Sequence, residues 1–162
     1  MAVADLIGAA VGVILLVIVA YLLVGSVIST AQIVTAAQKS ATLLEEQQLK
    51  TDFTIANTSM IDSTDFSCTI NNTGNMGISD FTHMDVIVYD SNSNTYTLYP
   101  YSPSPTPITG TWGIVNTGSD VIHHLELYPG NSYIIEVITT GSSPYWFQIT
   151  TGNGVYASAF LM

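Results

Sequence analysis

Apolar residues gather at the start of the chain. No charged residue lies between Asp5 and Lys39, and residues 6–28 are almost wholly apolar. A helix needs about 20 such residues to cross a bilayer. The stretch lacks the basic start of a secretory signal peptide and is too long for one, so we expect it to be retained. It therefore predicts a helix that lies in a membrane or in the core of an assembly.

The helical pattern continues past the apolar stretch. Ile33, Ala37, Ala41 and Leu44 follow at helical spacing with polar residues between them, and no proline or glycine occurs in residues 26–50. We therefore predict one helix over residues 4–49, about 70 Å long at 1.5 Å per residue. Its first half is apolar all round and its second half is amphipathic.

From residue 51 onward the pattern changes to short β-branched and aromatic runs separated by Asn, Gly, Pro, Ser and Asp. The runs are residues 51–57, 65–71, 84–90, 95–99, 111–115, 121–127, 132–139, 145–150 and 154–160. This spacing is typical of an all-β sandwich or barrel. The three prolines in residues 101–110 predict a long connection there. The predicted fold class is thus α+β, with a helical domain over residues 1–50 and a β domain over residues 51–162.

The β domain is aromatic-rich, and one run allows a prediction of facing. In "PYWFQI", strand alternation places Tyr145 and Phe147 on one face and Trp146 on the other. Most aromatic residues are expected in the core or in cross-strand pairs. An outward-facing one would suit a contact with another protein.

The charge balance excludes several classes of function. The only basic residues are Lys39 and Lys50, whereas nine acidic residues follow Lys50. Nucleic-acid binding needs clustered Lys or Arg, so we exclude it. Docking to anionic lipids is disfavoured for the same reason. The single cysteine, Cys68, can form no disulfide within the chain and is predicted to fill core space.

Motifs for catalysis are absent from the sequence, which has neither a G-x-S-x-G turn nor a P-loop. We expect no enzymatic activity. Asp90, Asn92 and Asn94 alternate like the start of a calcium loop, but the Gly and Glu of an EF-hand are missing. A surface Ca²⁺ ion is the only cofactor this pattern allows, and an ordinary hairpin turn is the favoured interpretation. His123 and His124 are adjacent, so in a strand they face opposite ways and cannot share a metal.

Two N-x-S/T sequences are candidate glycosylation sites, at Asn57 and Asn71. Both fall at the ends of predicted strands, where a glycan would face solvent. Such sequences also arise by chance in a chain rich in Asn, Ser and Thr. Together with the acidic, lysine-free composition they favour a β domain outside the cell. The positive-inside rule, with only two lysines beyond the apolar stretch, carries little weight here.

Small residues within the apolar stretch predict helix packing. Gly8 and Gly12 have the four-residue spacing that lets two helices approach closely, and Gly25 lies further along the same helix. The competing interpretation is that glycine is simply common in membrane helices. Asp5, near the helix start, suits the positive end of the helix dipole.

The order of elements in "AQKSATLLEEQQLKTDFTIANTS…FSCTINNTGNMGISDFTHMDVIVYD" resembles the archaeal branch of the type IV filament superfamily. Within it the sequence is most similar to the archaellum stator protein family, F component. The resemblance implies an immunoglobulin-like β domain, one membrane helix, and contact with the surface layer or other archaellum components. Archaellins and archaeal pilins share the layout but polymerise through the helix. There an acid at the place of Asp5 is thought to pair with a neighbour's N-terminal amine.

Two structural functions follow. In the first, which we take as the main hypothesis, the chain is a filament subunit that leaves the membrane, polymerises through its N-terminal helix and turns its β domains outward. In the second it is a single-pass membrane-anchored stator or adaptor whose β domain binds the surface layer. A sugar- or metal-binding module on a stalk is a third hypothesis, from another class.

Overall fold

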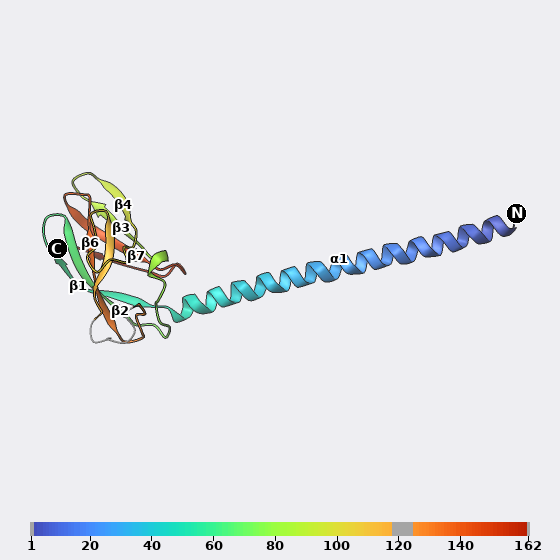
Figure 1. The fold of residues 1–162 in the computed structure, drawn as a ribbon, viewed down its shortest axis with the longest axis horizontal. Helices are drawn as coiled ribbons and strands as arrows, with labels where there is room; N and C mark the ends of the chain where they lie inside the picture. The colour runs from blue at the N-terminus through green and yellow to red at the C-terminus, as the bar shows by residue number, and fades with distance from the viewer. Residues whose placement is uncertain (1, 118–124, 162) are drawn as a thin grey trace. The chain divides into compact units, whose positions relative to one another are not determined.

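A computed structural model describes residues 2–117 and 125–161. The chain divides into two compact units, Met1–Leu44 and Glu45–Met162. The first element is one continuous helix, α1, Ala2–Lys50 (Figure 1). The long helix predicted from the sequence is therefore confirmed.

Threonine hydroxyls within α1 are satisfied by the helix itself. Thr30, Thr35 and Thr42 each donate a hydrogen bond to the carbonyl four residues earlier, at 2.8–3.0 Å. Such back-bonding lets a hydroxyl lie in an apolar environment without an unpaired donor. These polar residues are thus compatible with a membrane or with a packed helical core.

The side chains of α1 are exposed throughout the part that the structure describes. They include the long run of Leu, Ile and Val. In the described part of the chain this is the one helix long and apolar enough to cross a membrane; it lies within Leu6–Lys50, and its most apolar 18-residue window has a mean hydropathy of 2.9. An apolar surface of this extent requires lipid or other protein around it.

The last turn of the helix belongs to the second unit and is capped by a distant turn. The carbonyl of Lys50 accepts the N–H groups of Asn75 at 2.8 Å and Met76 at 3.1 Å. The carbonyl of Asp52 accepts the N–H of Gly74 at 2.9 Å. A Cβ at Gly74 would lie 2.5 Å from the backbone nitrogen of Asp52, so only glycine allows this approach.

A second loop holds the same turn from another side. Gln48 donates its side-chain N–H to the carbonyl of Asn153 at 2.6 Å. The Asn153 amide donates to the Thr51 hydroxyl at 2.8 Å. The end of α1 is thereby built into the β domain.

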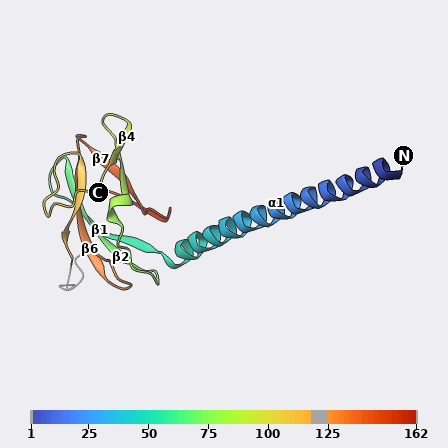
Figure 2. The same ribbon diagram turned by 45° about the vertical axis from the view of Figure 1, so that its right-hand side comes forward.

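The described residues of that domain form eight strands and one 3₁₀ helix. These are β1 Phe53–Met60, β2 Asp65–Asn72, η1 Phe81–His83, β3 Asp85–Asp90, β4 Thr95–Tyr99, β5 Thr111–Asn116, β6 Ser132–Ile138, β7 Pro144–Thr150 and β8 Tyr156–Phe160. They make two antiparallel sheets, in the orders β1-β2-β6-β5 and β4-β3-β7-β8. Figures 1 and 2 show this β domain from two sides.

This topology is that of an immunoglobulin-like sandwich. With the strands named A to G, the first sheet has the order A-B-E-D and the second C′-C-F-G. The predicted fold class, one long helix followed by an immunoglobulin-like sandwich, is confirmed.

The inner faces of the two sheets form one core. Alternation is regular on β2, where every second residue is buried. Phe66 on β2 and Phe147 on β7 meet across the sandwich with ring centroids 4.7 Å apart. Cys68 is buried and unpaired, as the sequence predicts, and burial raises the pKa of its thiol to about 12.

Two segments of the β domain, 101–110 and 121–127, contain no strand in the part that the structure describes. The proline-rich segment 101–110 is a connection without a strand of its own, as expected. The predicted run 121–127 falls partly outside the described residues, and with it His123 and His124. Of the part that is described, Leu127 forms an isolated bridge with Ile78 rather than a strand.

Candidate functional site

A row of aromatic side chains crosses the second sheet. Tyr96 on β4 pairs with Tyr89 on β3, Tyr89 pairs with Trp146 on β7, and Trp146 pairs with Phe160 on β8. Paired residues of an antiparallel sheet project to the same face. Since Val88 and Phe147, next along their strands, point into the core, the row faces outward.

Tyr145 completes this surface from a β-bulge. Its ring meets that of Phe160 edge-on, with centroids 5.5 Å apart and an interplanar angle of 66°, and the ring centroids of Tyr89 and Tyr96 are 4.9 Å apart. Tyr96 also meets Trp146 edge-on at 6.2 Å. The five residues, which we call the aromatic face, line a shallow concavity of about 410 Å³.

The aromatic face is open to solvent. Tyr96 is 69% exposed, Phe160 57% and Tyr145 51%. Tyr, Trp and Phe are enriched at protein interfaces, where their large area and low conformational entropy make burial favourable. A cluster of exposed aromatic side chains of this kind is a candidate interaction surface.

Strand alternation predicts the facing of Tyr145 wrongly. Tyr145 does not share a face with the buried Phe147; it is exposed, next to the half-buried Trp146. The pairing of β3 with β7 shifts at this point, because Tyr89 pairs with Trp146 but Asp90 pairs with Pro144. Tyr145 is the extra residue of the bulge and turns outward.

Hydrogen bonds occupy the predicted calcium-binding residues. Both carboxylate oxygens of Asp90 accept backbone N–H groups, from Asn92 and Ser93 on one side and from Ser142 and Ser143 on the other, at 2.7–2.9 Å. These bonds hold the pKa of the Asp90 carboxyl at about 2. Asp90 thus joins the β3–β4 turn to the loop before β7.

The two amides of the same motif also have partners. Asn92 donates to the Ser142 hydroxyl at 2.9 Å, while the Asn94 carbonyl accepts the phenolic O–H of Tyr89 at 2.8 Å. A cation would have to displace these donors. In the described part of the chain no three His, Cys, Asp or Glu side chains are placed to hold a metal, and the calcium site stays a prediction.

The candidate glycosylation sites lie on the first sheet. Asn57 is exposed on β1 and has a positive φ of 50° at the bulge of that strand. Asn71 on β2 is half-buried. Glycosylation of either stays a prediction.

A neighbouring asparagine that sequence reasoning missed is structural. Asn72 is 1% exposed, and its amide donates to the carbonyls of Met76 at 2.8 Å and Leu127 at 2.7 Å. Its own side-chain carbonyl accepts the N–H of Gly74 at 2.9 Å. Asn72 therefore holds the turn that caps α1. This structural role follows from the burial of its side chain, which the sequence does not show.

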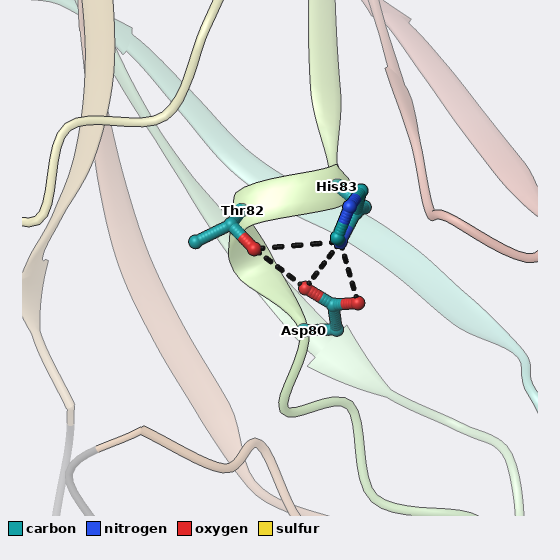
Figure 3. Close-up of polar contacts among 3 residues, drawn as sticks. All are labelled: Asp80, Thr82 and His83. Atoms are coloured by element: carbon teal, nitrogen blue, oxygen red, sulfur yellow. Dashed lines mark hydrogen bonds and ion pairs between the residues drawn. The ribbon is translucent and has the colours of Figure 1, made fainter.

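A small polar cluster, Asp80, Thr82 and His83, surrounds η1 (Figure 3). The carboxylate of Asp80 lies 2.7 Å from Nδ1 of His83 and accepts the Thr82 hydroxyl at 2.7 Å. These hydrogen bonds, that of His83 foremost, lower the pKa of the Asp80 carboxyl. All three side chains are exposed, and the cluster stabilises the local turn.

The small residues of α1 are open to a partner. A Cβ added at Gly8, Gly12 or Gly25 would meet no atom within 4 Å. This leaves their predicted role in helix packing possible in an assembly. Asp5 lies in the first turns of α1, and its side chain falls outside the described part.

Comparisons with known proteins give similarity at the level of structure. No protein-family model matches this sequence, and no curated protein matches it. Among solved structures, the archaellum periplasmic stator protein FlaG from Sulfolobus acidocaldarius is similar, with a TM-score of 0.52 and 19% identity. The match covers 68% of this chain and 99% of that one.

A second solved structure is the archaellum periplasmic stator protein complex of FlaF and FlaG from the same organism. It matches with a TM-score of 0.51 and 19% identity, over 67% of this chain and 87% of that one. At this identity the likeness establishes the fold. The resemblance to archaellum stator proteins that the sequence predicts is thus confirmed at the level of the fold.

Proposed function

We propose that the chain is a non-enzymatic, membrane-anchored adaptor of an archaellum-type motor. Its helix spans the cell membrane once, and its β domain lies outside the cell. There the β domain binds the surface layer or another component of the motor. The aromatic face is the surface through which it makes that contact.

The observation that carries this proposal is the direct connection of a membrane-length helix to a stator-like sandwich. α1 ends at Lys50 and β1 begins at Phe53. The apolar surface of α1 is uncovered, so lipid is a natural environment for it. The solved domains that share the fold of the sandwich are named periplasmic stator proteins.

The main hypothesis, that of a filament subunit, has less support. The structures reported above are stator proteins rather than polymerising subunits. What still favours assembly through the helix is the open pair Gly8 and Gly12. That pair serves equally well for two anchors side by side in a membrane.

Cysteine labelling tests the orientation. Cys68 is buried and its thiol pKa is raised, so the native chain should not react with a membrane-impermeant maleimide. Ser63 is exposed in the turn between β1 and β2. We expect Ser63→Cys to be labelled in intact cells as fully as in lysed ones. Labelling that needs lysis would place the domain in the cytoplasm and contradict the proposal.

Capture of partners tests the adaptor role. The full chain, held in lipid nanodiscs, should retain purified surface-layer protein or archaellum stator components from detergent-solubilised envelopes. Empty nanodiscs are the control. If neither is retained above that control, the adaptor role is wrong. Helical filaments of the purified chain in electron micrographs would instead support the filament subunit.

A further inference from the structure

We infer that the aromatic face binds a Lys or Arg side chain of a partner protein. This deepens the proposed function, on which it rests, by naming the chemistry that the adaptor recognises. The argument draws on ring geometry, on charge, and on the residues beside the concavity.

The geometry suits one cation in contact with several rings. The face of an aromatic ring carries negative potential, and a cation within about 6 Å of the ring centroid is attracted to it. Tyr96 is 4.9 Å from Tyr89 and 6.2 Å from Trp146, centroid to centroid, and both neighbours line the same concavity. A guanidinium or ammonium group placed there lies within reach of more than one ring.

The charge of the chain indicates what the ligand must be. No Lys or Arg follows Lys50, so the β domain cannot supply a cation to its own aromatic face. Lys50 itself pairs with Glu46 at 2.6 Å. Nine carboxylates follow Lys50 and produce a field that attracts basic partners. Asp90, next to Tyr89 on β3, is buried and bound by four backbone N–H groups, so it adds to this field without lining the concavity.

A second copy of this chain is a poor occupant for the same reason. Its β domain is equally acidic and offers no Lys or Arg after Lys50, so the charges of two copies oppose their contact. A basic partner both fills the concavity and neutralises the field.

Polar groups flank the rings and favour a charged side chain over a purely apolar one. Asn94 lies beside Tyr89, whose hydroxyl it binds. Gln148 and Ser158 are paired on β7 and β8 in the row next to Trp146 and Phe160. The side-chain carbonyl of Gln148 and the hydroxyl of Ser158 can accept the outer N–H groups of a guanidinium.

Fluorescence titration of the full chain in a non-ionic detergent tests the inference. The probe is the capped tripeptide acetyl-Gly-Arg-Gly-amide, and its control is the same peptide with neutral citrulline in place of arginine. Trp112 is fully buried, so a change in emission reports Trp146. We expect saturable binding of the arginine peptide that is about 3- to 30-fold tighter than that of the citrulline peptide, the range of a cation–π contact.

Two tyrosines provide a matched pair of variants. Tyr96 is 69% exposed within the aromatic face, and Tyr156 is 65% exposed on β8 outside it. Neither substitution removes a core residue. Tyr96→Leu should weaken arginine-peptide binding by about threefold or more, whereas Tyr156→Leu should leave it unchanged.

Several results would overturn the inference. They are equal binding of the two peptides, no saturable binding of either, or equal loss in the two variants. Saturable binding of chitobiose without binding of the arginine peptide would identify a glycan site instead. A dimer that dissociates on Tyr96→Leu, seen by sedimentation, would identify a second copy. If nanodisc-held chain captures its motor or surface-layer partner but the peptide does not bind, this inference fails and the proposed function stands.

Discussion

The strongest test of the fold is Asn72→Ala. Asn72 lies at the end of β2, buried between the turn that follows it and Leu127. Its amide donates two hydrogen bonds, and its carbonyl accepts one from Gly74. Alanine removes all three; the Leu127 carbonyl keeps the N–H of Ile78 and the Gly74 N–H keeps the carbonyl of Asp52, so the loss is that of the three side-chain bonds themselves.

The expected loss follows from these bonds. A neutral buried hydrogen bond contributes about 1 kcal/mol net, so the three together predict a loss of about 3 kcal/mol in the free energy of unfolding. Unfolding entropy is about 2.1 cal/mol/K per residue. For a unit the size of Glu45–Met162, the loss corresponds to a fall in Tm of about 12 °C.

Thermal unfolding of the full chain in detergent, followed by near-UV circular dichroism, measures this fall. Near-UV signals come from packed aromatic residues such as Trp112, so the helix in its micelle does not obscure the transition. Asn71→Ala, next in the same strand but half-buried, is the control. A fall below about 4 °C for Asn72→Ala, or one no larger than that of the control, refutes the reasoning.

Three further predictions follow from single contacts. Gly74→Ala places a Cβ 2.5 Å from the backbone nitrogen of Asp52, and overpacking of this kind should lower the free energy of unfolding by about 2 kcal/mol in a urea titration; unchanged stability would contradict it. The depressed pKa of Asp90 contributes stability that is present above its ordinary value of 3.8 and lost as pH falls through about 2. Tm should therefore fall between pH 4 and 2 more steeply in the native chain than in Asp90→Asn, and parallel profiles would contradict this. Gly12→Leu should reduce energy transfer between labelled copies in one nanodisc if the helices pack closely, whereas equal transfer would show that they do not.

The helix was predictable because its signal is local. The unbroken apolar stretch and the helical spacing after it lie in the same residues that form the helix. The position of the helix end was also predicted to within one residue, from the change of pattern at residue 51, but its cap was not, since neither glycine nor proline stands there. The chain leaves the helix where Asn75 and Met76 donate to the Lys50 carbonyl. Because these donors lie some 25 residues further along the chain, the residues around Lys50 do not predict this cap.

The aromatic face could not be predicted for a related reason. Each ring is visible in the sequence, but strand register decides which rings meet. The bulge opposite Asp90 reverses the facing of Tyr145 relative to simple alternation. Asp90 itself shows the same limit, because the spacing that resembles a calcium loop serves a carboxylate that binds backbone N–H groups from two loops.

The connection between helix and sandwich also has a mechanical consequence. Only Thr51 and Asp52 separate α1 from β1, and the turn holding Gly74 clamps both ends of that short segment. A pull on the β domain therefore meets several backbone hydrogen bonds in parallel before the chain can extend. The last turn of the helix is therefore a folded part of the β domain, and that turn can unravel only after these hydrogen bonds break.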